Sequence, residues 1–452
     1  MTTLESIKEY LQMLNPAELK KNLKDISTQD LIENWDDLSE DEEKIIFRNL
    51  PLDMKIDLMD SLSAKDQEDI IRGLTDGGIS GIKQLLKEME PDDLVDIIQS
   101  ASPDVRKSVW ENLSDDVKKE MIFLLKFDED DAAGLMTPRY IAIKSNITVG
   151  QALKFIRGQH AKDVETLYIV YVVDQLKRLI GLVSLRDLLE HEDDEIIKDI
   201  METDIISVHD DTDQEETAKI FITYGFLAVP VVDENNVLLG IVTYDDIIDV
   251  IREEQTEDVY KMGAMTGEIE PYLETSIWGM VKKRVPWLVI LLFLGTITTN
   301  VLAHYESIVM GAAFLFIFMP VITQTGGNVS NQSSALMIRG LATGEIEGED
   351  MWRILLKEMV IGLLMGLITG AAIFFRGVLF PPEITIFQGV AIAVSLCFVV
   401  VFSTVLGAFA PLLIHKMGFD PTVMSGPLLA TFIDVCGLSI YFEITKIILQ
   451  KF

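Results

Sequence analysis

The sequence predicts a multidomain membrane protein with a soluble first part and an all-α membrane domain at its end. Three observations predict this: an uneven charge distribution, an internal α/β repeat and a series of long apolar runs. Residues 1–275 hold 62 of the 72 acidic and 28 of the 38 basic residues, and therefore the whole net charge of −34. Residues 276–452 hold ten residues of each sign. An acidic surface repels nucleic acid and attracts cations, so we expect no nucleic-acid partner.

Residues 1–130 predict an acidic helical domain. Short apolar runs follow Ser, Asp or Pro and a group of acidic residues, as in SEDEEKIIFRNL and SPDVRKSVWENL. This arrangement is typical of helix N-termini. The regular spacing of these starts predicts a superhelix of short helices.

Residues 138–254 contain an internal repeat. LYIVYVVDQLKRLIGLVSLRDLLE (167–190) aligns without a gap on FLAVPVVDENNVLLGIVTYDDIID (226–249), with eight identities. Each copy predicts a strand, a polar turn, a second strand and a helix. The pattern resembles a tandem pair of α/β CBS domains, in which a Ser or Thr and an Asp after the second strand can hold an adenosine ribose. The resemblance implies a possible site for ATP or another adenine nucleotide, and the alternative is that each Asp only caps a helix. The residues at these positions are Ser184 with Asp187 and Thr243 with Asp246.

Residues 255–283 are expected to connect this module to the membrane. Val259 and Met262 belong to an apolar series at helical spacing within an acidic stretch. We expect a connecting helix, broken near Gly267 or Pro271, and a passive linker is the alternative.

Residues 284–452 predict five membrane-spanning helices, because a span needs about 20 mostly apolar residues. Lys and Arg are concentrated on one side of the predicted membrane, which favours a cytosolic N-terminus and an external C-terminus in a multi-pass protein of the cell membrane. Lys446 and Lys451 are a mild signal against this orientation. The five predicted spans are 285–304, 307–338, 359–375, 384–414 and 421–442.

The second predicted span carries a polar segment that lipid would not tolerate. It follows Pro320 and contains the Gly326–Gly327 pair, which loosens a helix. The segment either joins helices through hydrogen bonds or lines a water-filled path. The polar residues that we expect to line such a path are Asn328, Asn331 and Gln332, with Thr431 from the fifth span.

Asp434 lies inside the fifth predicted span, where a charge costs roughly 2.5–3.5 kcal/mol on insertion scales. The spans contain no Lys or Arg away from their ends, so Asp434 is a protonated acid, a proton relay or a cation site. One carboxylate with amide and hydroxyl oxygens suits Mg²⁺, which keeps much of its water. A homodimer would place two Asp434 side chains across its twofold axis.

The whole chain resembles the MgtE family of magnesium channels. TGGNVSNQSSALMIRGLATGE (325–345), DPTVMSGPLLATFIDVCGLSIYF (420–442) and DDIIDVIREEQTEDVYKMGA (245–264) follow the family's signatures. The resemblance implies a homodimeric channel that imports Mg²⁺ down its electrochemical gradient and closes when cytosolic Mg²⁺ binds. It implies that Asp434 holds hydrated Mg²⁺ in the pore and that Asp420 helps to bind Mg²⁺ to the connecting "plug" helix. The implied regulatory residues are Asp246, Asp249, Glu254, Glu257 and Asp258, with Asp92 and Asp96 of the N-terminal domain facing the CBS module.

Gly426 departs from some relatives, which have Asn at this position, and leaves a polar contribution there in doubt. Two other functions stay open from the residues alone: a proton-coupled divalent-cation transporter with Asp434 as the relay, and a membrane-tethered nucleotide sensor. The sequence shows neither a nucleophile–base constellation nor a Gly-rich phosphate loop, so we expect no enzyme.

Overall fold

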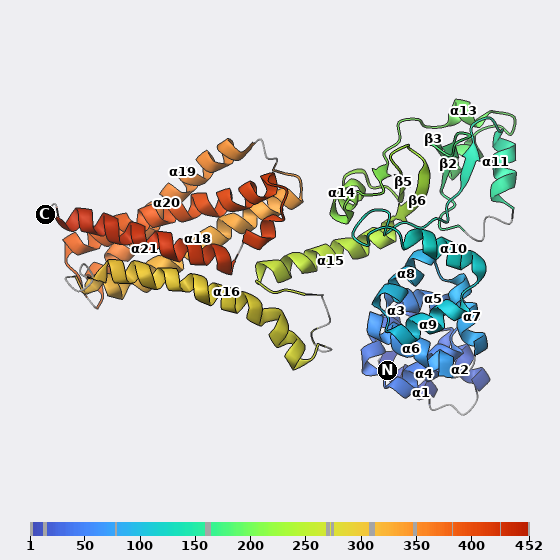
Figure 1. Ribbon diagram of the computed structural model, residues 1–452, viewed down its shortest axis with the longest axis horizontal. Helices are drawn as coiled ribbons and strands as arrows, with labels where there is room; N and C mark the ends of the chain where they lie inside the picture. Colours follow the sequence, from blue (N-terminus) through green and yellow to red (C-terminus); the bar gives the residue numbers. More distant parts are fainter. Residues whose placement is uncertain are drawn as a thin grey trace. The chain divides into compact units, whose positions relative to one another are not determined.

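The computed structural model describes residues 3–11, 16–76, 79–158, 164–267, 272, 275–306, 312–346, 350–381, 383–424 and 426–450. The chain forms two compact units, Met1–Ile251 and Arg252–Phe452. Figure 1 shows a helical array and an α/β module in the first unit and long helices in the second.

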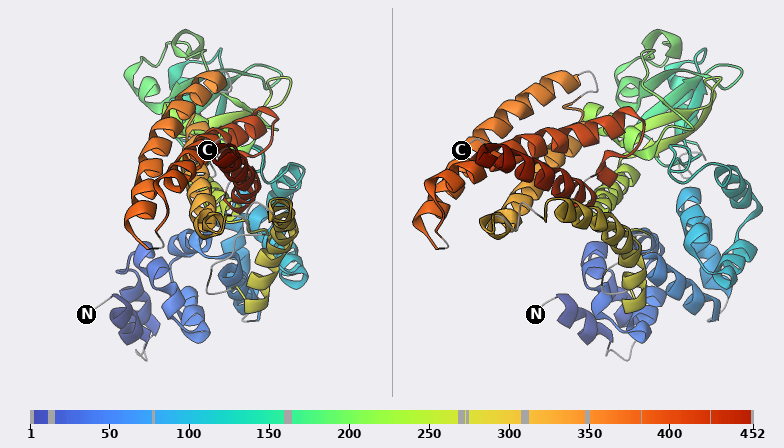
Figure 2. Two further views of the ribbon diagram at one scale, coloured as in Figure 1. Left: turned by 90° about the vertical axis from the view of Figure 1, so that its left-hand side faces the viewer. Right: turned by 60° about the vertical axis from the view of Figure 1, so that its left-hand side comes forward.

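The first unit begins with a stack of short helices, visible as a curved array in Figures 1 and 2. Their polar starts are as predicted: Ser39 and Glu42 form a capping box, and Ser114 Oγ accepts from Val117 N at 3.3 Å. Pro91 and Pro103 each open a helix, where the missing N–H has no cost. The helices are α1 Thr3–Leu11, α2 Pro16–Leu23, α3 Thr28–Glu33, the 3₁₀ turn Trp35–Asp37, α4 Glu40–Asn49, α5 Leu52–Ser61, α6 Ala64–Asp76, α7 Ile79–Glu88, α8 Pro91–Ser100, α9 Pro103–Asn112 and α10 Asp115–Leu124.

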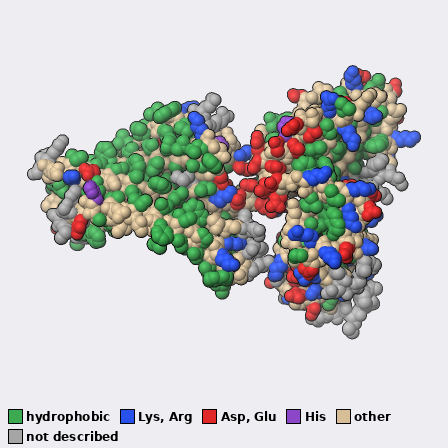
Figure 3. All heavy atoms as spheres, viewed as in Figure 1, with side chains coloured by type: hydrophobic (Ala, Val, Ile, Leu, Met, Phe, Trp, Pro, Cys, Tyr) green, Lys and Arg blue, Asp and Glu red, His purple; other side chains and the backbone are tan. Residues whose placement is uncertain are grey.

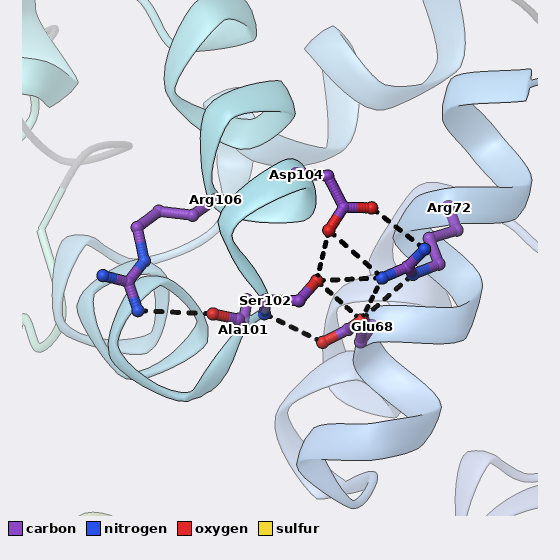
Figure 4. Close-up of polar contacts among 6 residues, drawn as sticks. All are labelled: Glu68, Arg72, Ala101, Ser102, Asp104 and Arg106. Atoms are coloured by element: carbon purple, nitrogen blue, oxygen red, sulfur yellow. Dashed lines mark hydrogen bonds and ion pairs between the residues drawn. The ribbon is translucent and has the colours of Figure 1, made fainter.

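A polar network joins helices of this array that are far apart in the sequence (Figure 4). Glu68 in α6 accepts hydrogen bonds from the backbone N–H of Ser102, at 3.0 Å, and from Arg72, at 2.6 Å. Arg72 also pairs with Asp104 at 2.9 Å. Glu68 therefore caps the start of α9, and the network fixes how α6 and α9 pack.

The α/β module consists of two three-stranded sheets that repeat the same topology. In each, the first strand pairs parallel with the second, and the second pairs antiparallel with the third. The first sheet has β1 Ala142–Lys144, β2 Ile169–Val173 and β3 Leu179–Ser184, with helices α11 Val149–Ile156, α12 Leu185–Glu190 and α13 Ile197–Ile200. The second has β4 Val208–His209, β5 Ala228–Val232 and β6 Leu238–Thr243, with helices α14 Gln214–Tyr224 and α15 Tyr244–Met262.

The turns between the paired strands show how closely the repeat is copied. Lys177 and Asn236, 59 residues apart, both have positive φ, at 62° and 61°. The two turns also bind each other: Leu179 N donates to Asn236 O at 2.9 Å, and Leu238 N donates to Lys177 O at 3.1 Å. The predicted gapless repeat is confirmed, and its copies face one another across these reciprocal bonds.

The second unit is built from five long helices in its described part: α16 Ile277–His304, α18 Phe314–Ala342, α19 Met351–Leu379, α20 Ile386–Lys416 and α21 Pro427–Gln450, with the 3₁₀ turn Pro421–Met424 before α21. Hydrophobic side chains cover most of the face seen in Figure 3. Among the described residues, α16, α19 and α20 are long and apolar enough to cross a membrane. α18 and α21 carry the polar residues, and five spans stays a prediction.

Several boundaries differ from those predicted. α15 continues through residue 254 without interruption to Met262, because helix-forming residues fill the stretch. It ends before Ala264 and Gly267, which have positive φ, whereas Pro271 lies outside the described residues. α19 begins eight residues before the predicted span and so includes Glu358.

Candidate functional site

Asp434 lies on α21 beside the glycine pair of α18. A Cβ atom at Gly326 would lie 2.9 Å from Ile433, and one at Gly327 would lie 3.9 Å from Ala430. These pairs run in opposite directions along the two helices, so the helices are antiparallel and Asp434 lies at the level of 323–325. The Asp434 side chain is half-buried, and the described residues give it neither a hydrogen bond nor an ion pair.

The polar segment of α18 has two distinct faces. Ser330, Ser333 and Ser334 are buried against other helices of the unit. Asn328, Asn331 and Gln332 are exposed and form a polar stripe that extends from the level of Asp434 toward the C-terminal end of α18. Thr431 is half-buried, and its hydroxyl donates within α21 to Pro427 O at 2.8 Å, so only its oxygen lone pairs are left for another ligand.

Asp420 lies in the turn before α21 and is bound by the end of α15. Lys261 Nζ lies 2.7 Å from Asp420 Oδ2 and 2.8 Å from Glu257 Oε1, and Thr422 donates to Asp420 Oδ1. Partial burial acts against the charged form of Asp420, but the bonds from Lys261 and Thr422 outweigh it and hold the pKa of the carboxyl below its usual value. The cation against Asp420 in this structure is therefore an ammonium group.

Gly426 explains why this turn and α15 approach so closely. Its φ is +59°, and a Cβ there would collide with the backbone oxygen of Met262. A larger residue at position 426 is incompatible with this contact. The turn after α15 is also held to α16, because Thr266 N donates to Lys283 O at 3.1 Å.

The first unit holds a second group of carboxylates, around Asp92 and Asp246. Asp92 Oδ1 is fully buried and accepts no hydrogen bond from the residues that the structure describes, and Asp246 accepts one from Thr243. Repulsion from Asp246 raises the pKa of several neighbours, which places their carboxyl groups near one another. The acid cluster, as we define it, consists of Asp60 in α5, Glu90, Asp92 and Asp93 at the start of α8, Glu165 before β2, and Asp246 in α15.

Every carboxyl of the acid cluster has a pKa above its ordinary value, and burial is the largest cause in each case. Glu90 and Glu165 hydrogen-bond each other, as do Asp60 and Asp93. Two carboxyl groups can bond in this way only by sharing a proton. A cation could displace the proton of each of these two pairs.

Sequence reasoning found Asp92 and Asp246 but missed Asp60, Glu90, Asp93 and Glu165. These four come from segments up to about a hundred residues apart, so no local spacing reveals them. The one available signal was the density of acids in EPDD (90–93) at a helix start, which the sequence reading attributed to capping.

Two other predicted regulatory residues lie at the edge of this group. Asp96 is exposed on α8, one turn beyond Asp92, and its charge helps to raise the pKa of Asp92. Asp249 is exposed on α15, and its charge helps to raise the pKa of Asp246. Glu254, Glu257 and Asp258 lie further along α15, in the second unit. Within the described ranges, no three Asp, Glu, His or Cys side chains are arranged to hold a metal ion directly.

The two predicted ribose sites differ in their surroundings. Ser184 and Asp187 form a capping box at the start of α12, with Ser184 Oγ 2.6 Å from Asp187 Oδ2. Thr243 and Asp246 form the matching pair, but Asp246 belongs to the acid cluster. An exposed Arg186 precedes Asp187, whereas Asp245 precedes Asp246.

Comparison with known proteins agrees with this architecture over the whole chain. Residues 6–130 match the MgtE intracellular N domain, 132–194 and 197–253 match CBS domains, and 319–444 match the MgtE divalent cation transporter family. The chain is 36% identical to the magnesium transporter MgtE of Thermus thermophilus over 98% of both sequences. It belongs to the MgtE family of magnesium transporters. The MgtE of Enterococcus faecalis is 38% identical over 73% of this chain and 71% of its own.

Among solved structures, the first unit is similar to the cytosolic domain of the Mg²⁺ channel MgtE in complex with ATP. The TM-score is 0.52 at 35% identity, covering 55% of this chain and 99% of the other. This MgtE protein is thus a membrane protein that transports Mg²⁺, and its family is one of transporters, not enzymes. The predicted fold class of helical domain, CBS pair and helical membrane domain is confirmed.

Proposed function

We propose that this MgtE protein is a homodimeric, Mg²⁺-selective channel of the cell membrane that imports Mg²⁺ and closes when cytosolic Mg²⁺ binds its acidic surfaces. The observation that carries the proposal is the position of Asp434 beside the exposed polar stripe of α18. In a single chain these groups would face lipid, where each unsatisfied polar group costs several kcal/mol. A second copy across a twofold axis would enclose them and bring two Asp434 carboxylates to one path.

Hydrated Mg²⁺ fits such a path better than a dehydrated ion. Mg²⁺ gives up its water reluctantly and is commonly held by one or two carboxylates through that water. Amide and hydroxyl oxygens from Asn328, Asn331 and Thr431 suit contacts with the water shell. A membrane potential of 100 mV drives a divalent ion inward by about 4.6 kcal/mol, so no second energy source is required.

We assign the regulatory role to the acid cluster and to α15. Carboxylates that now share protons would bind a hydrated Mg²⁺ ion instead, because a divalent cation neutralises two of them at once. α15 carries Asp246 at one end and Lys261 at the other. A shift of this helix upon Mg²⁺ binding would therefore reach the turn at Asp420 and Gly426. In this proposal α15 is the plug that closes the path. The C-terminus of the chain lies outside the cell.

We assign an adenine nucleotide to the half of the CBS pair that contains Ser184 and Asp187. Arg186 can pair with phosphate there, whereas the carboxylates around Asp246 would repel it. A relative's cytosolic domain binds ATP, which supports a nucleotide in this chain as well. Calorimetric titration of the full chain with ATP should show binding that Asp187→Ala removes and Asp246→Ala retains, and the reverse pattern would overturn the assignment.

The transport proposal is tested by Mg²⁺ flux into proteoliposomes with Asp434→Ala against the wild type, at several values of internal Mg²⁺ and pH. The proposal expects flux that follows the Mg²⁺ gradient and potential, stops at millimolar internal Mg²⁺ and is lost in the variant. Flux that requires a pH gradient would show instead that Asp434 is a relay in a proton-coupled transporter. Wild-type flux in the variant would remove Asp434 from the path.

A further inference from the structure

Glu358 is a buried carboxylate of the membrane domain that the proposed path does not use. It lies on α19 and is 6% exposed. One turn later, a Cβ at Gly362 would lie 2.9 Å from the hydroxyl of Thr404, so this face of α19 is closely packed against α20. In the part of the chain that the structure describes, Glu358 makes no ion pair.

The one partner that the described residues give to Glu358 is Ser333 of α18. Ser333 Oγ donates to Glu358 Oε2 at 2.9 Å, and both residues are buried. An ionisable group inside a membrane protein is costly and is expected to serve a function. Since its partner belongs to the polar segment of α18, that function concerns α18.

Between the large buried side chains of Ile322 and Met337, the packed face of α18 consists mainly of small residues, with Val329 among them. Gly326 lies against Ile433 and Ser403, and the backbone of Ser330 lies against Gly407. Small residues allow helices to approach closely, but they interlock little, so packing within 326–334 adds little to fixing the rotation of this segment. A specific hydrogen bond can supply the missing constraint.

The neighbouring hydroxyls do not supply this constraint. Ser330 Oγ donates to Gly327 O of its own helix at 2.9 Å, and Ser334 Oγ is buried with no hydrogen-bond partner in the described part of the chain. Among the described residues of the segment 324–334, Ser333 is the one whose side chain hydrogen-bonds to another helix.

The helical geometry connects this bond to the path. Successive residues of an α-helix are about 100° apart, so Asn331 and Asn328 project about 160° and 140° from Ser333. The bond that holds Ser333 toward α19 thereby directs both amides to the opposite side. A rotation of α18 by one residue, about 100°, would turn the amides of Asn328 and Asn331 away from that side.

We propose that Glu358 is a positioning residue of Mg²⁺ transport: through Ser333 it fixes the rotation of α18 and aims Asn328 and Asn331 into the path. This inference rests on the proposed path through Asp434 and α18. It requires Glu358 to accept a hydrogen bond, and it does not require a negative charge there.

The test measures flux of the full chain in proteoliposomes for Glu358→Ala, Glu358→Gln, Ser333→Ala and the double variant Ser333→Ala/Glu358→Ala. Half-saturating Mg²⁺ and the Mg²⁺ to Ca²⁺ flux ratio are compared. Glu358→Ala and Ser333→Ala should each change both quantities by about threefold to fifteenfold, the range of an interhelical hydrogen bond in a membrane protein. The double variant should equal the single ones, and Glu358→Gln should stay within about twofold because its amide oxygen still accepts from Ser333. The matched control is Glu443→Gln, the same substitution at a residue near the C-terminal end of α21.

Three results would overturn the inference. Glu358→Gln as impaired as Glu358→Ala would mean that the charge itself is needed. A lower maximal flux with unchanged half-saturation and selectivity would mean a structural role only. Wild-type parameters in Ser333→Ala, which removes a single hydroxyl and avoids a large cavity, would show that the bond does not position α18. Asp434→Asn is measured in parallel: if it transports normally the path itself is wrong, whereas loss there with normal Glu358 variants refutes this inference alone.

Discussion

The carboxylates of the acid cluster and the lone carboxylates of the membrane domain meet the same physical problem in different ways. In the cluster, six acids lie together, two pairs of them are hydrogen-bonded carboxyl to carboxyl, and the pKa values of all six are raised. In the membrane domain, Asp434 is half-buried on its own and Glu358 has one hydroxyl partner. A cation that binds to crowded carboxylates removes much of the repulsion between them, which suits a sensor. An isolated carboxylate holds a cation weakly enough to release it, which suits a path.

The largest effect is expected when one carboxylate in each region, the membrane domain and the acid cluster, is replaced by a neutral amide. Asp434→Asn should lower Mg²⁺ flux by at least about tenfold, because the path loses its charge, while Mg²⁺ still protects the cytosolic region from proteolysis. Asp246→Asn should have the opposite effect. Its flux should be that of the wild type, but both closure of the path and protection from proteolysis should require a higher Mg²⁺ concentration. If both variants lose flux to the same extent, the division into path and sensor is wrong.

The second expected effect is a dependence of stability on pH that Mg²⁺ removes. Asp60 has a pKa of about 6 and Glu90 of about 9, whereas the unfolded values are 3.8 and 4.5. Between these values the folded protein holds protons that the unfolded chain has lost, so stability without Mg²⁺ should fall as the pH rises from about 4 to about 9. Thermal unfolding should show a decrease of several degrees.

Millimolar Mg²⁺ should restore the unfolding temperature at pH 9 and change it little at pH 6, where protons occupy the cluster. Asp92→Asn/Asp93→Asn should flatten the pH dependence. A pH profile that is the same with and without Mg²⁺ would separate the acid cluster from Mg²⁺ binding.

A smaller effect is expected where α15 meets the membrane domain, and two glycines allow a matched test. Gly426 and Gly418 both have positive φ, which Asn tolerates well, but only Gly426 has a neighbour, the oxygen of Met262; Gly418 faces open space. Gly426→Asn should therefore weaken closure by Mg²⁺ several-fold, measured as flux at high internal Mg²⁺. Gly418→Asn should close normally, and equal behaviour of the two would point to backbone strain instead of this contact.

The smallest effect is expected from the ion pair between Lys261 and Asp420. Both side chains are partly exposed, and pairs of this kind contribute up to about 1 kcal/mol. Lys261→Ala should raise flux at low internal Mg²⁺ by about twofold to fivefold, because α15 loses a bond to the turn before α21. Lys446→Ala, which removes a pair with Glu443 on α21, serves as the control. Lower flux in Lys261→Ala would show that Lys261 does not hold the path closed.

Local patterns carried much of the fold prediction. The 59-residue offset between Asp174 and Asp233 predicted two equal strand pairs, and the structure reproduces even the positive φ of Lys177 and Asn236. Helix starts such as Ser39 and Ser114 were predictable from the sequence because a cap is made by residues a few positions apart. Helix ends were less predictable. The sequence placed the end of the CBS pair at residue 254, but α15 continues past this residue because no residue there breaks a helix.

The candidate site was only partly predictable, for a different reason. Asp434 stood out because its own span has no other charge, but Glu358 did not, since its neighbour Lys357 made it resemble a residue of the membrane surface. Lys261 was not identified either, because no local pattern pairs it with Asp420, 159 residues later.

The sequence by itself determined the domain order, the repeat, the membrane character of the last part and the exceptional position of Asp434, because composition, periodicity and isolated charges are properties of neighbouring residues. Only the tertiary structure decided which carboxylates gather around Asp246, which hydroxyl meets Glu358 and why position 426 must be small. Those outcomes depend on the packing of segments far apart in the chain, where a difference of a few ångströms decides whether two acids share a proton or lie apart.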